Sequence, residues 1–347
     1  MNSASDAQTT GPAVRTHFAV LDGWRAVSIL LVIAGHWLPL NVILPGANSA
    51  AGAGGMALFF TLSGFLIVQF VLKRPEPVPF LIRRFLRILP LAWAAVVLLF
   101  LVAWWRGSAQ ADVTFLAANL FFYGNLPPAH LFEGGGHLWS LAVEMHFYLM
   151  IALLIAVGGR KSLYCLPLLA VMVTLARIVA GETISIVTWH RIDEILAGAT
   201  LALVYFGVLG DGIKRRLAGT PLWAAVVLAI VCTWLIDSPL AYARPYAVAL
   251  MVGVTLYHVP NWLEKILSSK PAAYIAQISY ALYVFHVMFG ATWLGSGDTF
   301  EKYAKRPVLA LVTWGAAHLS TFHFEKRFTD LARRWTTKGP SHPLSTY

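Results

Sequence analysis

Charged residues are scarce in this chain. Only 12% of its 347 residues are Asp, Glu, Lys or Arg, and 58% are hydrophobic, whereas soluble globular domains carry about 25% charged residues. A soluble protein of this length could not keep so much apolar surface away from water, so the composition excludes an ordinary soluble fold. It predicts an all-α fold, a polytopic helical membrane protein without a separate soluble domain.

Acidic residues and cysteines are also few. The chain has 16 acidic and 26 basic residues, giving a formal net charge of +10. The basic residues lie between apolar stretches and not on one soluble face, so no nucleic-acid partner is expected. The two cysteines, Cys165 and Cys232, each sit inside an apolar segment. Their number and spacing fit neither a disulfide framework nor a metal site.

Long hydrophobic runs, by contrast, are frequent. Bilayer crossing takes about 20 mainly apolar residues in a helix. The sequence predicts about ten such transmembrane helices, at 24–41, 54–72, 88–105, 138–157, 163–180, 191–209, 221–237, 243–260, 273–293 and 308–325.

The basic residues are distributed unevenly between the predicted loops. With the N-terminus placed inside, 18 of the 26 Lys and Arg fall on the cytoplasmic side and 5 outside, and the other three lie within spans or at their ends. This bias follows the positive-inside rule and predicts a multi-pass protein with both termini in the cytoplasm. Residues 1–17 lack the features of a signal peptide and are expected to be a flexible cytoplasmic segment. Residues 331–347 are expected to be a cytoplasmic tail.

An arginine and a histidine share the first predicted span. Arg25 and His36 are eleven residues apart, about three helical turns, so their side chains lie on nearly the same face. Ionisable side chains in a bilayer are costly, and their default interpretation is functional. His36 suits a general base for a hydroxyl proton, and Arg25 suits a phosphate or a developing oxyanion. Alternatively, Asp22 neutralises Arg25, and His36 only hydrogen-bonds a neighbouring backbone.

The segment HLWSLAVEMHFYL at 137–149 carries a second polar stripe. Glu144 and His36 are predicted to lie at similar depths, each measured from the outer end of its own span. Glu144 would then orient the His36 imidazole as a third catalytic residue. Trp139 and Tyr148 are predicted to contact the acceptor. A structural contact of Glu144 with arginine or tyrosine on a neighbouring helix is the alternative.

Three arginines follow the second predicted span. Arg83, Arg84 and Arg87 fall within an arc of about 100° on a helix, which suits either an interfacial helix that binds lipid headgroups or a phosphate site for a phosphorylated donor such as a coenzyme A thioester. Ser63, in the span before them, is assigned to the same donor site. Its neighbour Gly64 favours close helix packing as the alternative, and a nucleophilic serine would need a base that the local sequence does not provide.

Two later segments carry candidate acceptor-binding residues. Arg191 and Asp193 are predicted to open a span at the outer face, where topology anchoring is the alternative. Tyr283 and His286 are spaced by three residues in the predicted span 273–293. They could line a sugar pocket, or they could serve helix packing.

Together these segments resemble the acyltransferase-3 family of integral membrane enzymes. The resemblance runs in order to about residue 330. Arg327 stands where the family usually has a proline after Glu325, and this departure makes the resemblance weaker at Glu325 than at the other segments. The matching segments are LDGWRAVSILLVIAGH at 21–36, MALFFTLSGFLI at 56–67, RRFLRILP at 83–90, LWSLAVEMHFY at 138–148, the Arg, Asp and Gly of 191–198, and ISYALYVFH at 278–286.

The resemblance implies an enzyme of the bacterial inner membrane, with residues 18–330 as its acyltransferase domain. It would move an acyl group, most commonly acetyl, from cytoplasmic acetyl-CoA to a hydroxyl of a cell-surface or exported glycan or a lipid-linked saccharide. The family's essential Arg and His correspond to Arg25 and His36. Acetyl-CoA is then the donor substrate, no cofactor is permanently bound, membrane lipids surround the protein, and a homo-oligomer is left open. The alternative is a proton-coupled transporter of a small polar or lipid-linked metabolite, because intramembrane Arg, His and Glu also suit proton relays.

Overall fold

The computed structural model describes residues 19–336, and every regular element in that range is a helix. The α-helices are α1 (Ala19–Trp37), α2 (Leu40–Ile43), α3 (Ala47–Lys73), α4 (Pro77–Trp105), α5 (Val113–Leu120), α6 (Trp139–Gly158), α7 (Leu166–Ala180), α8 (Asp193–Tyr205), α9 (Asp211–Ala218), α10 (Leu222–Trp234), α11 (Arg244–Thr255), α12 (Asn261–Leu267), α13 (Lys270–Gly290), α14 (Thr299–Ala304), α15 (Arg306–Leu319) and α16 (Lys326–Thr336). Short 3₁₀ turns are η1 (Gly136–Leu138), η2 (Gly159–Cys165), η3 (Thr188–His190), η4 (Pro239–Ala243) and η5 (Trp293–Gly295), and η6 (Ser320–Glu325) is a π-helix.

Proline marks the start of five of these helices. A proline in the first turn costs no hydrogen bond, because the first amides of a helix have no partner within it. Such prolines open α4, α7, α11, α13 and α15. In α4 the helix begins at Pro77 and continues through Pro90 to Trp105. The arginine run is therefore the first part of the same helix that contains the predicted span 88–105, and both interpretations of the run stay predictions.

Five helical stretches are long and apolar enough to cross a membrane, or six if α9 and α10, which meet at 88°, form one broken span. Apolar helices α8, α11 and α15 also coincide with predicted spans but are shorter than 18 residues. An all-helical protein with membrane-length helices is therefore confirmed, whereas ten spans and the lack of a soluble domain stay predictions. The five stretches are Ala19–Trp37, Ala47–Lys73, Pro77–Trp105, Gly136–Ala180 and Lys270–Gly290.

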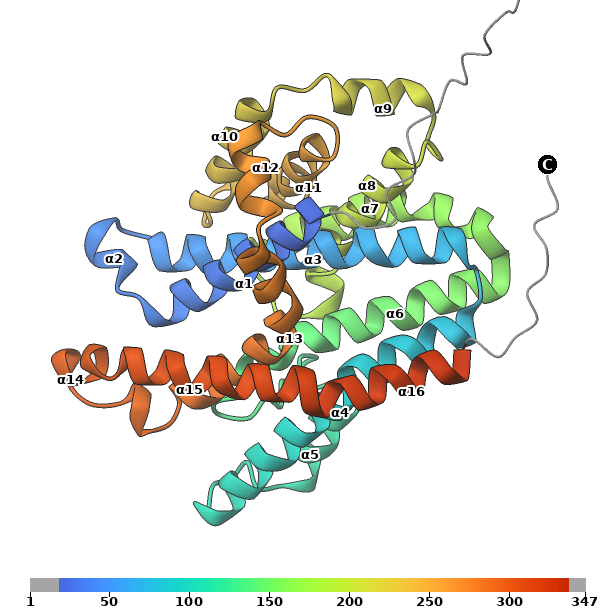
Figure 1. The fold of residues 1–347 in the computed structure, drawn as a ribbon. Helices are drawn as coiled ribbons and strands as arrows, with labels where there is room; N and C mark the ends of the chain where they lie inside the picture. Colours follow the sequence, from blue (N-terminus) through green and yellow to red (C-terminus); the bar gives the residue numbers. More distant parts are fainter. Residues whose placement is uncertain (1–18, 337–347) are drawn as a thin grey trace, which may run out of the picture.

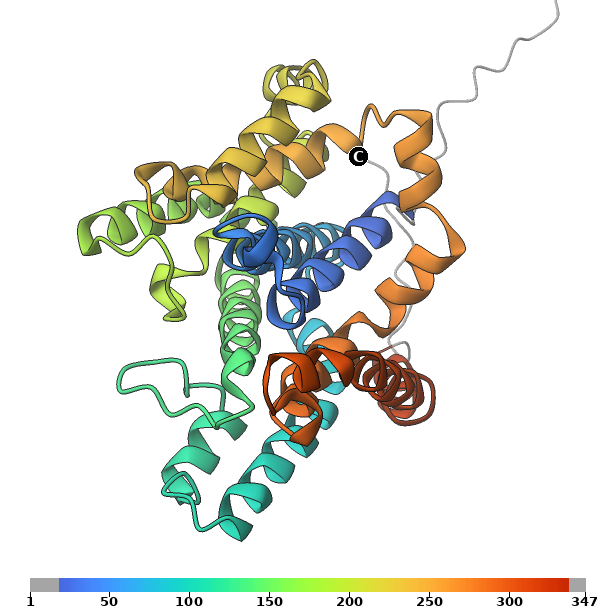
Figure 2. The same cartoon turned by 90° about the vertical axis from the view of Figure 1, so that its left-hand side faces the viewer.

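Helix α3 forms the centre of the bundle and is the most buried of the five stretches. Figure 2 shows α1 and α3 in the middle, with the other helices arranged around them. Two glycines let α3 and α8 cross backbone to backbone: a Cβ on Gly64 would lie 1.9 Å from the carbonyl oxygen of Ile195, and one on Gly198 would lie 2.0 Å from that of Thr61. Small residues of this kind allow membrane helices to approach closely.

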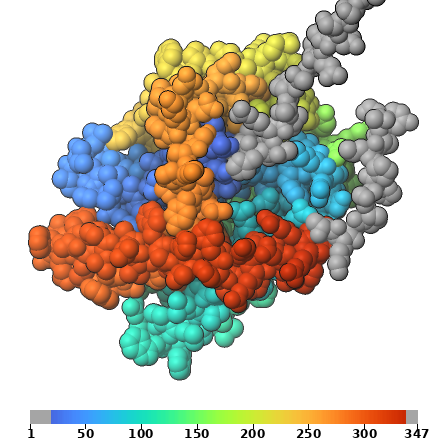
Figure 3. All heavy atoms as spheres, in the orientation of Figure 1, coloured from blue at the N-terminus to red at the C-terminus, as the bar shows by residue number. Residues whose placement is uncertain are grey.

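The C-terminal helices form a band along one face of the bundle, as Figures 1 and 3 show. Helix α16 packs against the first part of α4, and Arg83 Nε donates a 2.6 Å hydrogen bond to Thr336 Oγ1. The tail predicted from residue 331 therefore begins inside α16. The expectations for residues 1–17 and for residues after 336 lie outside the described part of the chain.

Candidate active site

Helices α6 and α13 carry polar side chains at matching levels. Ser140 Oγ donates to Tyr283 Oη at 2.7 Å. One level further along the same pair, His137 Nε2 lies 3.0 Å from Val284 O. In the opposite direction, Glu144 faces the same cavity as Ser279. These levels define two ends of one polar row: an arginine end marked by Arg84 and Arg87, and a histidine end marked by His36, His137 and His286.

A cavity occupies the arginine end, between α1, α3, α4, α6 and α13. Its apolar walls come mainly from α3. Its polar lining residues are Arg25, Ser63, Arg84, Arg87, Glu144, Tyr148, Ser279 and Tyr280. Five residues predicted to be catalytic or donor-binding are thus brought together from four helices, with Tyr148 and parts of α13 completing the cavity.

Positive charge exceeds negative charge in this cavity. Its lining holds three guanidinium groups, on Arg25, Arg84 and Arg87, and one carboxylate, on Glu144. Asp22 lies 3.8 Å from Arg25 on the same helix, and the Arg84 guanidinium lies 6.0 Å from the centre of the Tyr148 ring. Guanidinium groups bind phosphate and carboxylate with paired hydrogen bonds, so the cavity suits an anionic ligand.

Glu144 is engaged at the arginine end and not by His36. Both Ser63 Oγ and Tyr148 Oη donate hydrogen bonds to Glu144 Oε1. His36 lies with His137, which is seven residues from Glu144 along the chain, a rise of about 10 Å in a helix. The prediction that Glu144 orients His36 is therefore wrong. The local sequence provides no base for Ser63. In the structure the Glu144 carboxylate, which belongs to a different helix, lies next to it.

Three histidines meet at the histidine end. The exposed His36 ring lies 5.1 Å from the His286 ring, and that ring lies 5.2 Å from His137. His36 Nδ1 is 2.8 Å from Val32 O. Because a carbonyl oxygen only accepts, Nδ1 carries the proton and Nε2 is left as a proton acceptor. The predicted base therefore has a free acceptor nitrogen. His137 had no predicted role, and its place on the polar stripe of 137–149 was the only signal for it.

An amide side chain holds the connection next to His36. Asn48, in the first turn of α3, donates from Nδ2 to Gly35 O and to Leu38 O, each at 2.7 Å. Its own backbone and that of Asn41 exchange 2.9 Å hydrogen bonds with the partner's side chain. The end of α1 that carries His36 is therefore fixed to α3.

The predicted acceptor-binding residues are mostly held inside the protein. Tyr283 is buried and donates to His137 O at 2.5 Å. Tyr148 lines the arginine end, away from His36. Trp139 has its ring 5.5 Å from the Arg191 guanidinium. Of the predicted set, only His286 contacts His36 directly through its ring.

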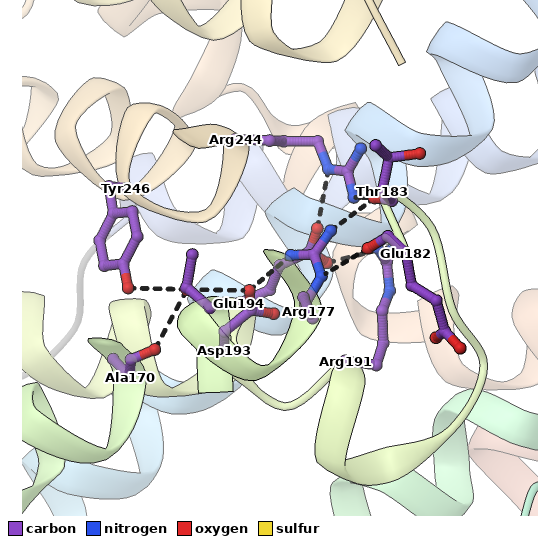
Figure 4. A network of polar contacts seen from close by, with 10 residues as sticks. Ala170, Arg177, Glu182, Thr183, Arg191, Asp193, Glu194, Arg244 and Tyr246 are labelled. Carbon is purple, nitrogen blue, oxygen red and sulfur yellow. Dashed lines mark hydrogen bonds and ion pairs between the residues drawn. The ribbon is translucent and has the colours of Figure 1, made fainter. Parts of the chain in front are cut away.

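Arg191 and Asp193 belong to a buried ionic network, which Figure 4 shows. Arg177 Nη1 lies 2.5 Å from Asp193 Oδ2, and Glu194 is shared by Arg191 at 3.2 Å and Arg244 at 2.9 Å. These side chains are almost completely buried. The network joins α7, α8 and α11, and this burial argues against the predicted contacts of Arg191 and Asp193 with an external acceptor.

Replacing Arg177 by methionine is expected to destabilise the protein by about 3–5 kcal/mol, because it leaves the Asp193 carboxylate buried without its cation. The double variant Arg177→Met with Asp193→Leu should recover most of this loss. Asp330→Asn, which weakens an exposed pair with Arg333, should change stability little. Thermal unfolding of the detergent-solubilised variants measures all three, and equal stability of Arg177→Met and the parent would contradict the expectation.

Outside the spans, the segment after α7 carries one perturbed carboxylate. A hydrogen bond from Ser185, followed by the contact with His190, lowers the pKa of the Glu182 carboxyl below its usual value. His190 Nδ1 donates to Glu182 Oε2 at 2.9 Å. This pair orders the segment that covers the ionic network. In residues 19–336, no group of three or more His, Cys, Asp or Glu side chains is placed to hold a metal ion.

Comparison with known proteins identifies the family. The chain is 28% identical to a peptidoglycan O-acetyltransferase of Listeria monocytogenes over 78% of this chain and 49% of that protein, and 28% identical to a putative peptidoglycan O-acetyltransferase of Bacillus subtilis over 77% and 47%. It is 22% identical to nodulation protein 10 of Rhizobium leguminosarum over 82% and 85%. The chain spans about half the length of the first two relatives, and no solved structure matches it. A family model described as an acyltransferase domain matches residues 18–317, so the chain belongs to the acyltransferase-3 family.

Proposed function

We propose that this protein is a membrane O-acyltransferase that moves an acetyl group from cytoplasmic acetyl-CoA to a hydroxyl of a cell-surface or exported glycan. The observation that carries the proposal is the single polar row that joins a cationic cavity to an exposed histidine. With a cytoplasmic donor and an acceptor outside the cytoplasm, such an enzyme needs a donor site and an acceptor site that open toward opposite sides. The row provides one candidate for each.

The arginine end is the proposed donor site. Coenzyme A carries phosphates, and the excess of guanidinium groups at Arg25, Arg84 and Arg87 suits them. The Lys and Arg bias of the loops supports placing this end toward the cytoplasm of a bacterial inner membrane, with both termini on that side. Ser63 and Tyr148 line the same cavity and supply hydroxyl groups beside the donor.

The histidine end is the proposed acceptor site. His36 Nε2 removes the proton of the acceptor hydroxyl, whose oxygen attacks the acyl carbon of the thioester. The carbon–sulfur bond breaks, and coenzyme A leaves as the thiol after taking the proton. Arg25 and His36 are eleven residues apart, about 16 Å along a helix. Arg25 therefore holds the body of the donor, and the oxyanion forms nearer to His36.

The names of the relatives support the acceptor class. Two of them are named as O-acetyltransferases of peptidoglycan, a glycan outside the cytoplasm. A sugar hydroxyl is also the group that a neutral imidazole can deprotonate during attack on a thioester.

A reconstituted assay tests the proposal. Purified protein in liposomes is given acetyl-labelled acetyl-CoA on one side and peptidoglycan fragments on the other, and labelled ester and free thiol are measured together. Equal amounts of ester and thiol support acyl transfer. Movement of a solute without thioester loss would instead indicate the proton-coupled transporter, and neither product above the protein-free background would contradict the proposal.

Replacing Arg84 by glutamine is expected to raise the KM for acetyl-CoA at least about tenfold, because a hydrogen bond to a charged group contributes about 1.5–3 kcal/mol. The kcat should change less, because the arginine is away from the reacting carbonyl. Arg215→Gln, at an exposed position of α9, is the matched control and should leave the KM unchanged. A KM that is the same in all three proteins would remove Arg84 from the donor site.

A further inference from the structure

The three rings of the histidine end each have one nitrogen fixed by a backbone carbonyl. Since a carbonyl oxygen only accepts, each of these nitrogens carries a hydrogen, and the other nitrogen of each neutral ring is an acceptor. The free acceptors are therefore Nε2 of His36, Nε2 of His286 and Nδ1 of His137. The fixed contacts are His36 Nδ1 with Val32 O at 2.8 Å, His286 Nδ1 with Tyr283 O at 2.7 Å, and His137 Nε2 with Val284 O at 3.0 Å.

Two of the free acceptors are buried. His286 Nε2 and His137 Nδ1 have no hydrogen-bond partner among residues 19–336, and their side chains are 0% and 7% exposed. A buried acceptor without a donor costs about 1–3 kcal/mol. Such groups in a native protein call for an explanation, and a catalytic role is one of the recognised explanations. Here the orphaned nitrogens belong to rings that form one continuous contact with His36.

In the part of the chain that the structure describes, no carboxylate is among the ring contacts of His36, His137 and His286. The titratable group in contact with these three rings is Tyr283, whose ring lies 5.2 Å from His137 and 5.5 Å from His286. Glu144 and Arg191 interact electrostatically with Tyr283 and are not among the ring contacts of the three histidines. Helix α3 has one charged residue, Lys73, at its opposite end, and α15 has Arg306 in its first turn. A carboxylate such as the one that stabilises imidazolium in a catalytic triad is missing from the contacts of the described rings.

We propose that His286, supported by His137, is a positioning residue that stabilises the proton taken up by His36. This inference rests on the proposed acyl transfer. The acceptor O–H bond breaks, and the proton bonds to His36 Nε2. The resulting N–H donates to the lone pair of His286 Nε2. The acceptor oxygen then bonds to the acyl carbon, the carbon–sulfur bond breaks, and the proton passes from His36 to the leaving sulfur. A second proton would place two cations about 5 Å apart in a poorly polarisable site. The three histidines, called the trio below, therefore take up one proton in total.

The test compares pH–rate profiles of the full-length protein in liposomes. His286→Phe keeps a ring but has no lone pair, and its kcat should fall about 100-fold, within the range of general-base effects. The KM for the glycan should change little. The acidic limb of the profile should move to lower pH, because ionised His36 has lost its partner and releases its proton more readily. His286→Gln, whose amide oxygen accepts, should regain about tenfold of the lost rate.

A histidine outside the trio provides the control. His318 on α15 pairs with Tyr274 Oη at 3.0 Å, and His318→Phe should leave kcat, KM and the pH profile unchanged. The proposal is overturned if His286→Phe keeps the parent's pH profile, or if its loss appears only in the KM for the glycan. The second result would make His286 an acceptor-binding residue.

A measurement without turnover separates this inference from the proposed function. Nitrogen-15 spectra of histidine-labelled protein in bilayers are assigned with the three single variants and followed between about pH 8 and 5, the range in which histidine changes charge. The His36 and His286 nitrogens should shift together as one proton is taken up, and His286→Phe should move the His36 transition to lower pH. A His36 transition that is independent of His286 overturns the inference, even if acetyl transfer is confirmed. Failure of transfer with coupled shifts overturns only the proposed function.

Discussion

Replacing His36 by alanine is expected to lower the rate of acetyl transfer about 1,000-fold, because a positioned general base contributes about 10²- to 10⁴-fold. His36 is the exposed member of the trio, and its Nε2 faces no protein donor among the described contacts. The other two free acceptor nitrogens at that level, on His137 and His286, belong to buried residues. The assay is ester formation from acetyl-CoA by purified protein at equal concentration.

The fold should survive this change. The hydrogen bond of the His36 side chain goes to Val32 O in its own helix, so its loss leaves the packing of α1 against α3 intact. Thermal unfolding and gel filtration check this, and His318→Ala provides a control at another histidine. Transfer by His36→Ala above about a tenth of the parent rate would exclude His36 as the base.

Replacing Gly64 by alanine is expected to destabilise the bundle by about 3 kcal/mol or more, at or beyond the upper end of overpacking effects. The added Cβ would lie 1.9 Å from Ile195 O and 2.7 Å from Ala199 N. Both are backbone atoms of α8, so no side-chain rotation can relieve the overlap. Helices α3 and α8 would have to separate, and α8 also carries the carboxylates of the ionic network. The yield of folded protein and its unfolding temperature measure the effect.

Gly52, on the same helix, is the matched control. A Cβ at this position meets no atom within 4 Å, and an alanine there should be neutral or slightly stabilising because alanine favours helix more than glycine does. If Gly64→Ala and Gly52→Ala unfold at the same temperature, the close crossing of α3 and α8 is not a feature of the folded protein.

Helix locations were largely predictable from the sequence, but helix ends were not. Apolar runs and the Lys and Arg bias located the helices. However, the first helix was expected at 24–41 and extends over Ala19–Trp37. A shift of four or five residues is about 6–7.5 Å along the axis. It places His36 in the last turn of α1, next to His286 and away from the level of Glu144. Depth cannot be deduced from one span, because it depends on which turn of each helix meets its neighbour.

The candidate site shows the same limit. The predicted residues Arg25, Ser63, Arg84 and Arg87 share one cavity. Arg83, predicted for the same donor site, lies outside its lining and donates to Thr336 instead. The network around Asp193 was not predictable, because its partner Arg177 belongs to another helix and the sequence does not show which helices pack together. Local motifs identify the polar side chains. Their partners lie in segments that are distant in the sequence, and only the folded structure shows how these segments pack.

The hydrogen bonds of Asn48 have a consequence for the binding entropy of the proposed glycan acceptor. The Asn48 amide ties Gly35 and Leu38 to the start of α3 without any ligand, so the imidazole next to it is already ordered when a sugar chain arrives. Binding then costs the protein little conformational entropy, and most of the entropy loss falls on the flexible polymer. Short or rigid saccharides should therefore be captured with smaller entropic losses than long, mobile strands that present the same hydroxyl.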